Sequence, residues 1–110
     1  MITLLHVDGR DCPVVVCDWC GERIEKGSDG NCEWLADAEG QPLLGVAVDC
    51  RGRPIAGPLF FAHKHCSRPC EKRNGHSLFQ GLDVFLFHLE RNCSFDRRST
   101  KRIADLLMRL

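Results

Sequence analysis

Four side chains of the kinds that bind metal ions occur as two short pairs. Cys17 and Cys20 form a CxxC segment, and His63 and Cys66 form an HxxC segment much later in the chain. Thiolate sulfur and imidazole nitrogen are ligands that four-coordinate Zn²⁺ prefers in proteins. The residue types and the equal spacing of the pairs therefore predict one zinc site built from all four side chains.

Two neighbouring residues compete for places in this site. His65 is an alternative to His63, and Cys70 is an alternative to either ligand of the second pair. We favour His63 with Cys66 because their spacing repeats that of the first pair, whereas adjacent His65 and Cys66 would diverge on a strand. His65 is then expected at the surface or beside a ligand.

The other cysteines lack a second paired spacing. A Cys on a strand or an apolar helical stripe usually behaves as a small buried hydrophobe, and we expect Cys93 in the core for this reason. A second metal site formed by Cys12, Cys50 and Cys70 is the alternative.

Catalytic uses of these residues fit the sequence less well than a structural use. A redox-active CxxC lies at the start of a helix in a βαβ unit, but a β-rich run leads into Cys17, and Asp18 would oppose thiolate formation. A hydrolytic zinc site needs an open coordination position and a general base. Three thiolates with one His close the site, and Glu71 alone is more typical of a solvated carboxylate. We expect no enzymatic activity, with a CxxC thiol oxidoreductase as an alternative.

The first pair is preceded by a predicted β-hairpin. Its strands are residues 2–7 and 13–16, separated by the turn-like run of residues 8–11. Gly21 follows Cys20 directly, which suits a zinc knuckle because Gly tolerates the positive φ that lets backbone N–H groups point at sulfur. Residues 22–31 are predicted to form a loop.

The second pair is preceded by a predicted three-strand meander. The strands are residues 32–37, 43–49 and 55–63, with turns at 38–41 and 50–53. A short helix is expected over residues 67–75, with Ser67 as its cap and Gly75 as its end.

The apolar period changes to that of a helix from residue 78 onward. One stripe of this helix contains the following residues: Leu78, Leu82, Phe85, Leu86, Leu89 and Cys93. Phe87 lies toward the polar side, as an exposed contact residue or an extension of the apolar face. A second helix is predicted near the C-terminus, with an apolar face formed by Ile103, Leu106, Leu107 and Leu110.

These motifs resemble those of treble-clef zinc fingers. In that resemblance Cys17-Asp18-Trp19-Cys20-Gly21 is the knuckle, and His63 and Cys66 enter the short helix. The same segments, with the stretch of residues 82–92 inside the predicted helix, are similar to those of small bacterial zinc-binding proteins of no known function. The resemblance implies Zn²⁺ and a fold, but no activity.

The predicted fold is therefore α+β, a small antiparallel β-sheet of hairpin plus meander with C-terminal helices. We expect residues 1–110 to form a single zinc-binding domain, with a β-rich zinc module at 1–75 and a helical pair at 76–110 packed on it. We find no internal repeat. The start of the chain lacks the basic and apolar regions of a signal peptide, no run of 18 apolar residues occurs, and a cytoplasmic protein with reduced thiols is expected.

The charge is unevenly distributed along the chain. Residues 1–50 carry three basic and ten acidic side chains, whereas residues 51–110 carry twelve and five, although the chain is neutral overall. We expect a protein-interaction or adaptor role with a protein partner. Nucleic-acid binding is the alternative, through basic residues of the C-terminal helices: Arg97, Arg98, Lys101 and Arg102.

Overall fold

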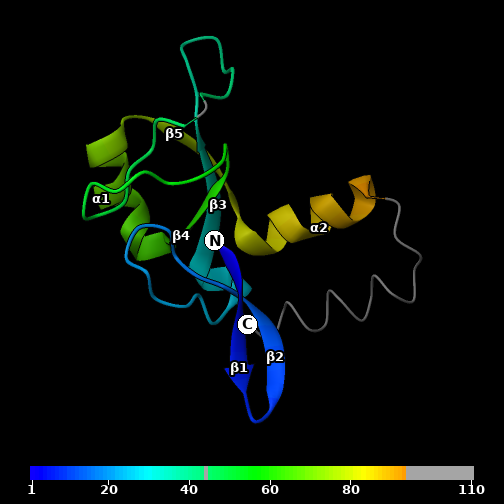
Figure 1. Ribbon diagram of the computed structural model, residues 1–110. Coiled ribbons are helices and arrows are strands. Elements are labelled where there is room, and N and C mark those ends of the chain that lie inside the picture. The colour runs from blue at the N-terminus through cyan, green and yellow to red at the C-terminus, as the bar shows by residue number, and fades with distance from the viewer. Residues whose placement is uncertain (44, 94–110) are drawn as a thin grey trace.

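The computed structural model describes residues 1–43 and 45–93 (Figure 1). In chain order its elements are β1 (Ile2–Val7), β2 (Arg10–Val15), the 3-10 helix η1 (Gly27–Asp29), β3 (Gly30–Leu35), β4 (Phe60–His63), α1 (Lys64–Asn74), β5 (Ser77–Gly81) and α2 (Leu82–Asn92). The strands form two antiparallel sheets. The predicted α+β class is confirmed for the described residues.

The predicted N-terminal hairpin is confirmed. Strands β1 and β2 pair from Ile2 opposite Val15 to Val7 opposite Arg10, which leaves Asp8 and Gly9 as a two-residue turn. Both turn residues have positive φ, as in the type I′ turn that is favoured for two-residue hairpin loops. The hairpin projects from the body of the protein (Figure 1), and its buried end at Val14 and Val15 leads directly into Cys17.

The second sheet differs from the predicted meander. It has the order β4-β3-β5, so β5 pairs with β3 in the place expected for residues 43–49. The described part of residues 36–59 makes only isolated bridges, Ala36 with Pro42 and Val48 with Pro54. Proline lacks the N–H group that an extended strand ladder needs, which explains why pairing stops at each of these bridges.

These bridges close two turns that repeat the same pattern, D-x-x-G-x-P, which was missed in the sequence. The aspartates are Asp37 and Asp49, and each accepts hydrogen bonds at 2.9 Å from the backbone N–H groups two and four residues later. Gly40 and Gly52 have φ of +81° and +79°. The predicted turns at 38–41 and 50–53 are therefore confirmed, and each turn reverses the chain without building a strand.

Both helices start at positions other than those predicted. Helix α1 begins a turn earlier, at Lys64, with His63 rather than Ser67 at its N-cap, and ends as expected before Gly75. Helix α2 begins at Leu82, since residues 77–81 pair with β3. Leu78 is therefore a strand residue and not part of the helical stripe, because a spacing of four residues does not distinguish a helix from a strand over so short a run.

The core consists of two clusters of buried side chains. The first contains Val15, Cys17, Ile24, Cys32, Phe61, Ala62, Cys66 and Leu82, and the second contains Leu35, Ala47, Ile55, Phe60 and Cys70. Ile24 is fully buried although its segment was predicted as a loop, and Gly30 leaves room for it. A Cβ at Gly30 would lie 2.9 Å from Ile24 Cγ2 and 3.2 Å from Leu82 Cδ2.

Candidate metal centre

The CxxC segment folds into a tight knuckle at the end of the hairpin. Its backbone is closed by a hydrogen bond from Gly21 N–H to the Cys17 carbonyl at 2.9 Å, and Gly21 has φ of +81°. Two further N–H groups point at sulfur: Cys20 N–H to Cys17 Sγ and Glu22 N–H to Cys20 Sγ, both at 3.5 Å. The predicted knuckle conformation is therefore present, and it offers donors that stabilise thiolate charge.

The HxxC segment lies where strand β4 passes into helix α1. His63 is the last residue of β4, and Cys66 is buried in the first turn of the helix. A backbone hydrogen bond holds the knuckle against this junction, from Asp18 N–H to the Phe61 carbonyl at 2.7 Å. The long intervening chain is thus returned to the knuckle by β4.

The two segments bring four ligand atoms together. The three sulfurs and the nitrogen of Cys17, Cys20, His63 and Cys66 all lie within 4.8 Å of one another. His63 Nδ1 is 3.5 Å from Cys20 Sγ and 4.0 Å from Cys66 Sγ. Among the described residues this is the single group of three or more His, Cys, Asp or Glu side chains arranged to hold a metal ion.

The orientation of the His63 ring makes Nδ1 the candidate ligand atom. Its other nitrogen, Nε2, lies 3.0 Å from the Arg23 carbonyl oxygen, which can only accept a hydrogen bond. Nε2 must therefore carry the proton, and in the neutral ring the lone pair of Nδ1 faces the sulfurs. A backbone carbonyl that fixes the tautomer in this way is the usual support of a metal-binding histidine.

The competing residues lie outside the group. His65 is exposed and stacks on the His63 ring, with 4.8 Å between the centroids, so it covers the candidate ligand. Cys70 is buried in the second core cluster, where burial raises the pKa of its thiol to about 11. Cys12, Cys50 and Cys70 form no metal group in the part of the chain that the structure describes.

The pKa of one thiol in the group is lowered, and the pKa values of the other two are raised. Burial acts to raise the pKa of Cys17, but hydrogen bonds with the backbones of Cys20, His63 and Trp19 outweigh it, and the pKa lies below its usual value. Burial raises the pKa of Cys20 and of Cys66, and repulsion from the neighbouring thiolate adds to both shifts. A bound cation would compensate this repulsion, so metal binding should displace protons.

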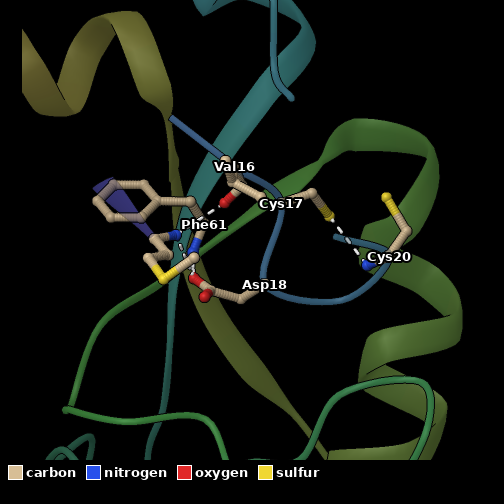
Figure 2. A network of polar contacts seen from close by, with 6 residues as sticks. Val16, Cys17, Asp18, Cys20 and Phe61 are labelled. Carbon is tan, nitrogen blue, oxygen red and sulfur yellow. Dashed lines mark hydrogen bonds and ion pairs between the residues drawn. The ribbon is translucent and has the colours of Figure 1, made fainter. Parts of the chain in front are cut away.

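The two residues inside the CxxC segment have structural contacts. The Asp18 carboxylate accepts a hydrogen bond from Phe61 N–H at 2.8 Å and one from the Met1 ammonium at 2.7 Å (Figure 2). Trp19 packs against both core clusters. These roles were missed because a sequence pattern does not reveal which distant backbone group a side chain will meet.

A buried carboxylate supports the first turn of α1. Glu33 on β3 is 1% exposed and accepts hydrogen bonds from Ser67 Oγ at 2.9 Å and Ser77 Oγ at 3.1 Å. Ser67 in turn accepts one from the Asn31 side chain at 3.0 Å. Burial is the main reason why the pKa of Glu33 is raised. The residue that follows Cys66 is thereby fixed to the central strand, which was not expected from the sequence.

Several predictions concern other regions. Cys93, expected in the core, is exposed: it caps the C-terminal end of α2, whose buried residue, Leu82, lies at the other end of the helix. Phe87 is 52% exposed, with the Arg91 guanidinium 5.7 Å from its ring centre. The second C-terminal helix and the basic residues Arg97, Arg98, Lys101 and Arg102 lie outside the described residues, so the helical pair at 76–110 stays a prediction.

The helices that the structure describes are too short to cross a lipid bilayer. Comparison of the chain with protein-family models, curated proteins and solved structures finds no match. The chemistry of the four clustered side chains is therefore the basis for assigning a role to this protein.

Proposed function

We propose that this protein is a non-enzymatic zinc module in which Cys17, Cys20, His63 and Cys66 bind one structural Zn²⁺. The observation that carries the proposal is the convergence of four ligand atoms within 4.8 Å. With Zn–S near 2.3 Å and Zn–N near 2.0 Å, tetrahedral ligand atoms are separated by roughly 3.5–3.8 Å. The separations from His63 Nδ1 to two of the sulfurs, 3.5 and 4.0 Å, are close to that range.

A structural role fits this site better than a catalytic one. Four protein ligands leave no coordination position for water, which a catalytic zinc needs. Two of the four ligands, Cys17 and Cys66, belong to the same buried core cluster. The ion would thus join the knuckle to the β4–α1 junction and close the long segment between them, in the manner of a treble-clef finger.

Metal analysis tests the proposal directly. Protein purified without a histidine tag is expected to contain one equivalent of zinc, and Co²⁺ in its place should give the absorption of a tetrahedral thiolate site. Cys20→Ser should remove both signals, whereas Cys70→Ser should keep them because Cys70 lies in the other core cluster. Less than half an equivalent of zinc in the wild-type protein would refute the site.

The proposed interaction role has separate support. Four of the six residues of β1 are apolar and at least 42% exposed: Ile2, Leu4, Leu5 and Val7. An exposed apolar strand of this kind is typical of a surface that contacts another protein. We place this adaptor role in the cytoplasm, where the cysteines would stay reduced until they bind metal.

The oxidoreductase alternative makes a different prediction. If Cys17 and Cys20 exchange disulfides, the metal-free protein should reduce insulin disulfides, and Cys20→Ser should abolish the reaction. We expect no turnover, because Asp18 and Trp19 fix the knuckle through Phe61 and the core.

A further inference from the structure

Helix α1 has two faces with opposite properties. Cys66, Cys70 and Asn74 follow one another at intervals of four residues, and their side chains are buried or half-buried against the rest of the protein. Lys64, Arg68 and Lys72 repeat at the same interval, offset by two residues, and all are exposed. Residues four apart lie on one helix face and about 6 Å apart along the axis. The outer face is therefore a regular row of three cations.

A second basic segment lies beside the end of this row. Asn74 binds the backbone of Val48 through its side-chain oxygen at 2.7 Å and its nitrogen at 3.0 Å, which fixes the turn at 49–53 to α1. The Arg73 guanidinium reaches this turn, since a Cβ at Gly52 would lie 3.6 Å from Arg73 Nη2. Six of the seven Lys and Arg residues at positions 51–93 belong to α1 and this turn: Arg51, Arg53, Lys64, Arg68, Lys72 and Arg73. We call them the α1 basic surface.

The acidic side chains near this surface neutralise little of it. The Asp49 carboxylate accepts hydrogen bonds from its own turn and contacts Arg53 Nε at 3.2 Å, so it offsets one arginine. Glu71 on α1 has its carboxylate 3.5 Å from His76 Nδ1. Four of the other five cations are held on a helix that is anchored to the core, and Arg51 lies on the turn fixed to that helix. The α1 basic surface therefore presents a preorganised positive charge.

We propose that the α1 basic surface binds the phosphate backbone of a nucleic-acid duplex without sequence specificity. The charge of the row complements closely spaced phosphates, and arginine forks suit phosphate oxygens. The exposed face of α1 carries a single apolar residue, Pro69, and its one ring, that of His65, is stacked on His63. A protein interface would need an apolar or aromatic centre, whereas contacts with phosphate are mainly polar and charged. This binding is additional to the zinc site and does not depend on which metal the site holds.

Fluorescence anisotropy with a labelled 20-base-pair DNA duplex tests the proposal on the full chain. The triple variant Lys64→Gln, Arg68→Gln, Lys72→Gln should lose at least ten-fold in affinity at low salt. The slope of log affinity against log salt should also become shallower by roughly 2–3, as expected when three phosphate contacts are lost. A matched control, Arg10→Gln, Lys26→Gln, Arg91→Gln, removes the same charge from exposed positions outside α1 and should change the affinity less than three-fold.

Other outcomes would overturn the proposal. The first is the absence of wild-type binding to DNA at low salt. The second is an equal loss of affinity in the matched control. The third is a loss of affinity that occurs only when four other basic residues are replaced by Gln: Arg97, Arg98, Lys101 and Arg102. Equal competition by poly-glutamate at the same charge concentration would indicate an acidic protein partner instead. Unchanged zinc content and melting temperature of each variant would establish that the fold is intact, and a duplex RNA probe would identify the type of nucleic acid preferred.

Discussion

The two core clusters use the same residue type for different purposes. Helix α1 contributes Cys66 to the first cluster and Cys70, one turn later, to the second. Cys66 faces two cysteines and a histidine, whereas Cys70 faces apolar side chains and the amide of Asn74, with Asn74 Nδ2 at 3.5 Å from its sulfur. A cysteine thus becomes a candidate metal ligand through the elements packed opposite it. Its position on the helix does not decide this.

Replacing the two helical cysteines one at a time should give the largest difference between the clusters, in both zinc content and stability. Cys66→Ser is expected to abolish zinc binding and unfold the domain, because structural zinc contributes on the order of 10 kcal/mol in small zinc modules. Cys70→Ala should keep one equivalent of zinc and cost about 1–2 kcal/mol. Metal content with urea unfolding of both variants measures this difference. Similar losses of stability would show that both clusters depend on packing alone.

Trp19 is the side chain that packs against both clusters, so its removal should affect them together. We expect Trp19→Ala to lower the free energy of unfolding by about 2–4 kcal/mol, as for other large core side chains that are partly exposed. The zinc content should stay at one equivalent, since Cys17 and Cys20 are retained. Trp34→Ala, which changes a half-buried tryptophan on β3, is a suitable comparison. A selective loss of zinc in Trp19→Ala would mean that the knuckle depends on this ring.

Glu33 should make stability depend on pH in the direction opposite to the metal site. Its pKa is raised in the folded protein, so the fold binds this proton more tightly than the unfolded chain does. Its contribution is then fully present below the unfolded pKa and is lost as pH rises through the folded pKa. We therefore expect the stability advantage of the wild type over Glu33→Gln to shrink as pH rises. Urea unfolding of both proteins between pH 5 and 8 measures this difference in the free energy of unfolding. Glu39→Gln, at an exposed position, should give a flat difference.

The two D-x-x-G-x-P turns allow the finest comparison. Asp37→Ala and Asp49→Ala remove equivalent pairs of backbone hydrogen bonds, and Asp49→Ala also removes the exposed contact with Arg53 Nε at 3.2 Å. The second turn also contacts the knuckle, since Cys50 N–H donates to the Trp19 carbonyl at 3.2 Å. Asp49→Ala should lower the melting temperature more than Asp37→Ala does. Equal shifts in thermal unfolding would show that the second turn does not help to hold the knuckle.

Much of the site was predictable because its chemistry is encoded locally. The two x2 spacings and Gly21 predicted the knuckle and the ligand group, since a CxxC segment can turn both thiols to one point wherever it is placed. The hairpin and the end of α1 at Gly75 were predictable for the same reason, because turn and cap residues act on their nearest neighbours.

The sheet could not be predicted in the same way. Residues 43–49 and 77–81 are both short apolar runs, and their own sequences do not specify which of them pairs with β3. The prolines at 42 and 54 limit the segment around residues 43–49 to isolated bridges. Only the assembled fold places residues 77–81 beside β3. The buried position of Ile24 likewise depends on the space that Gly30 leaves.

The sequence by itself determined which side chains can bind a metal, because ligand chemistry and two-residue spacing are local properties. Only the tertiary structure decided which histidine and which helical cysteine join the group. It did so by pointing His63 Nε2 at the Arg23 carbonyl, by directing Cys66 at the knuckle and by burying Cys70 in the other cluster. These choices depend on contacts between residues far apart in the chain, which form only when β4 returns the second pair to the first.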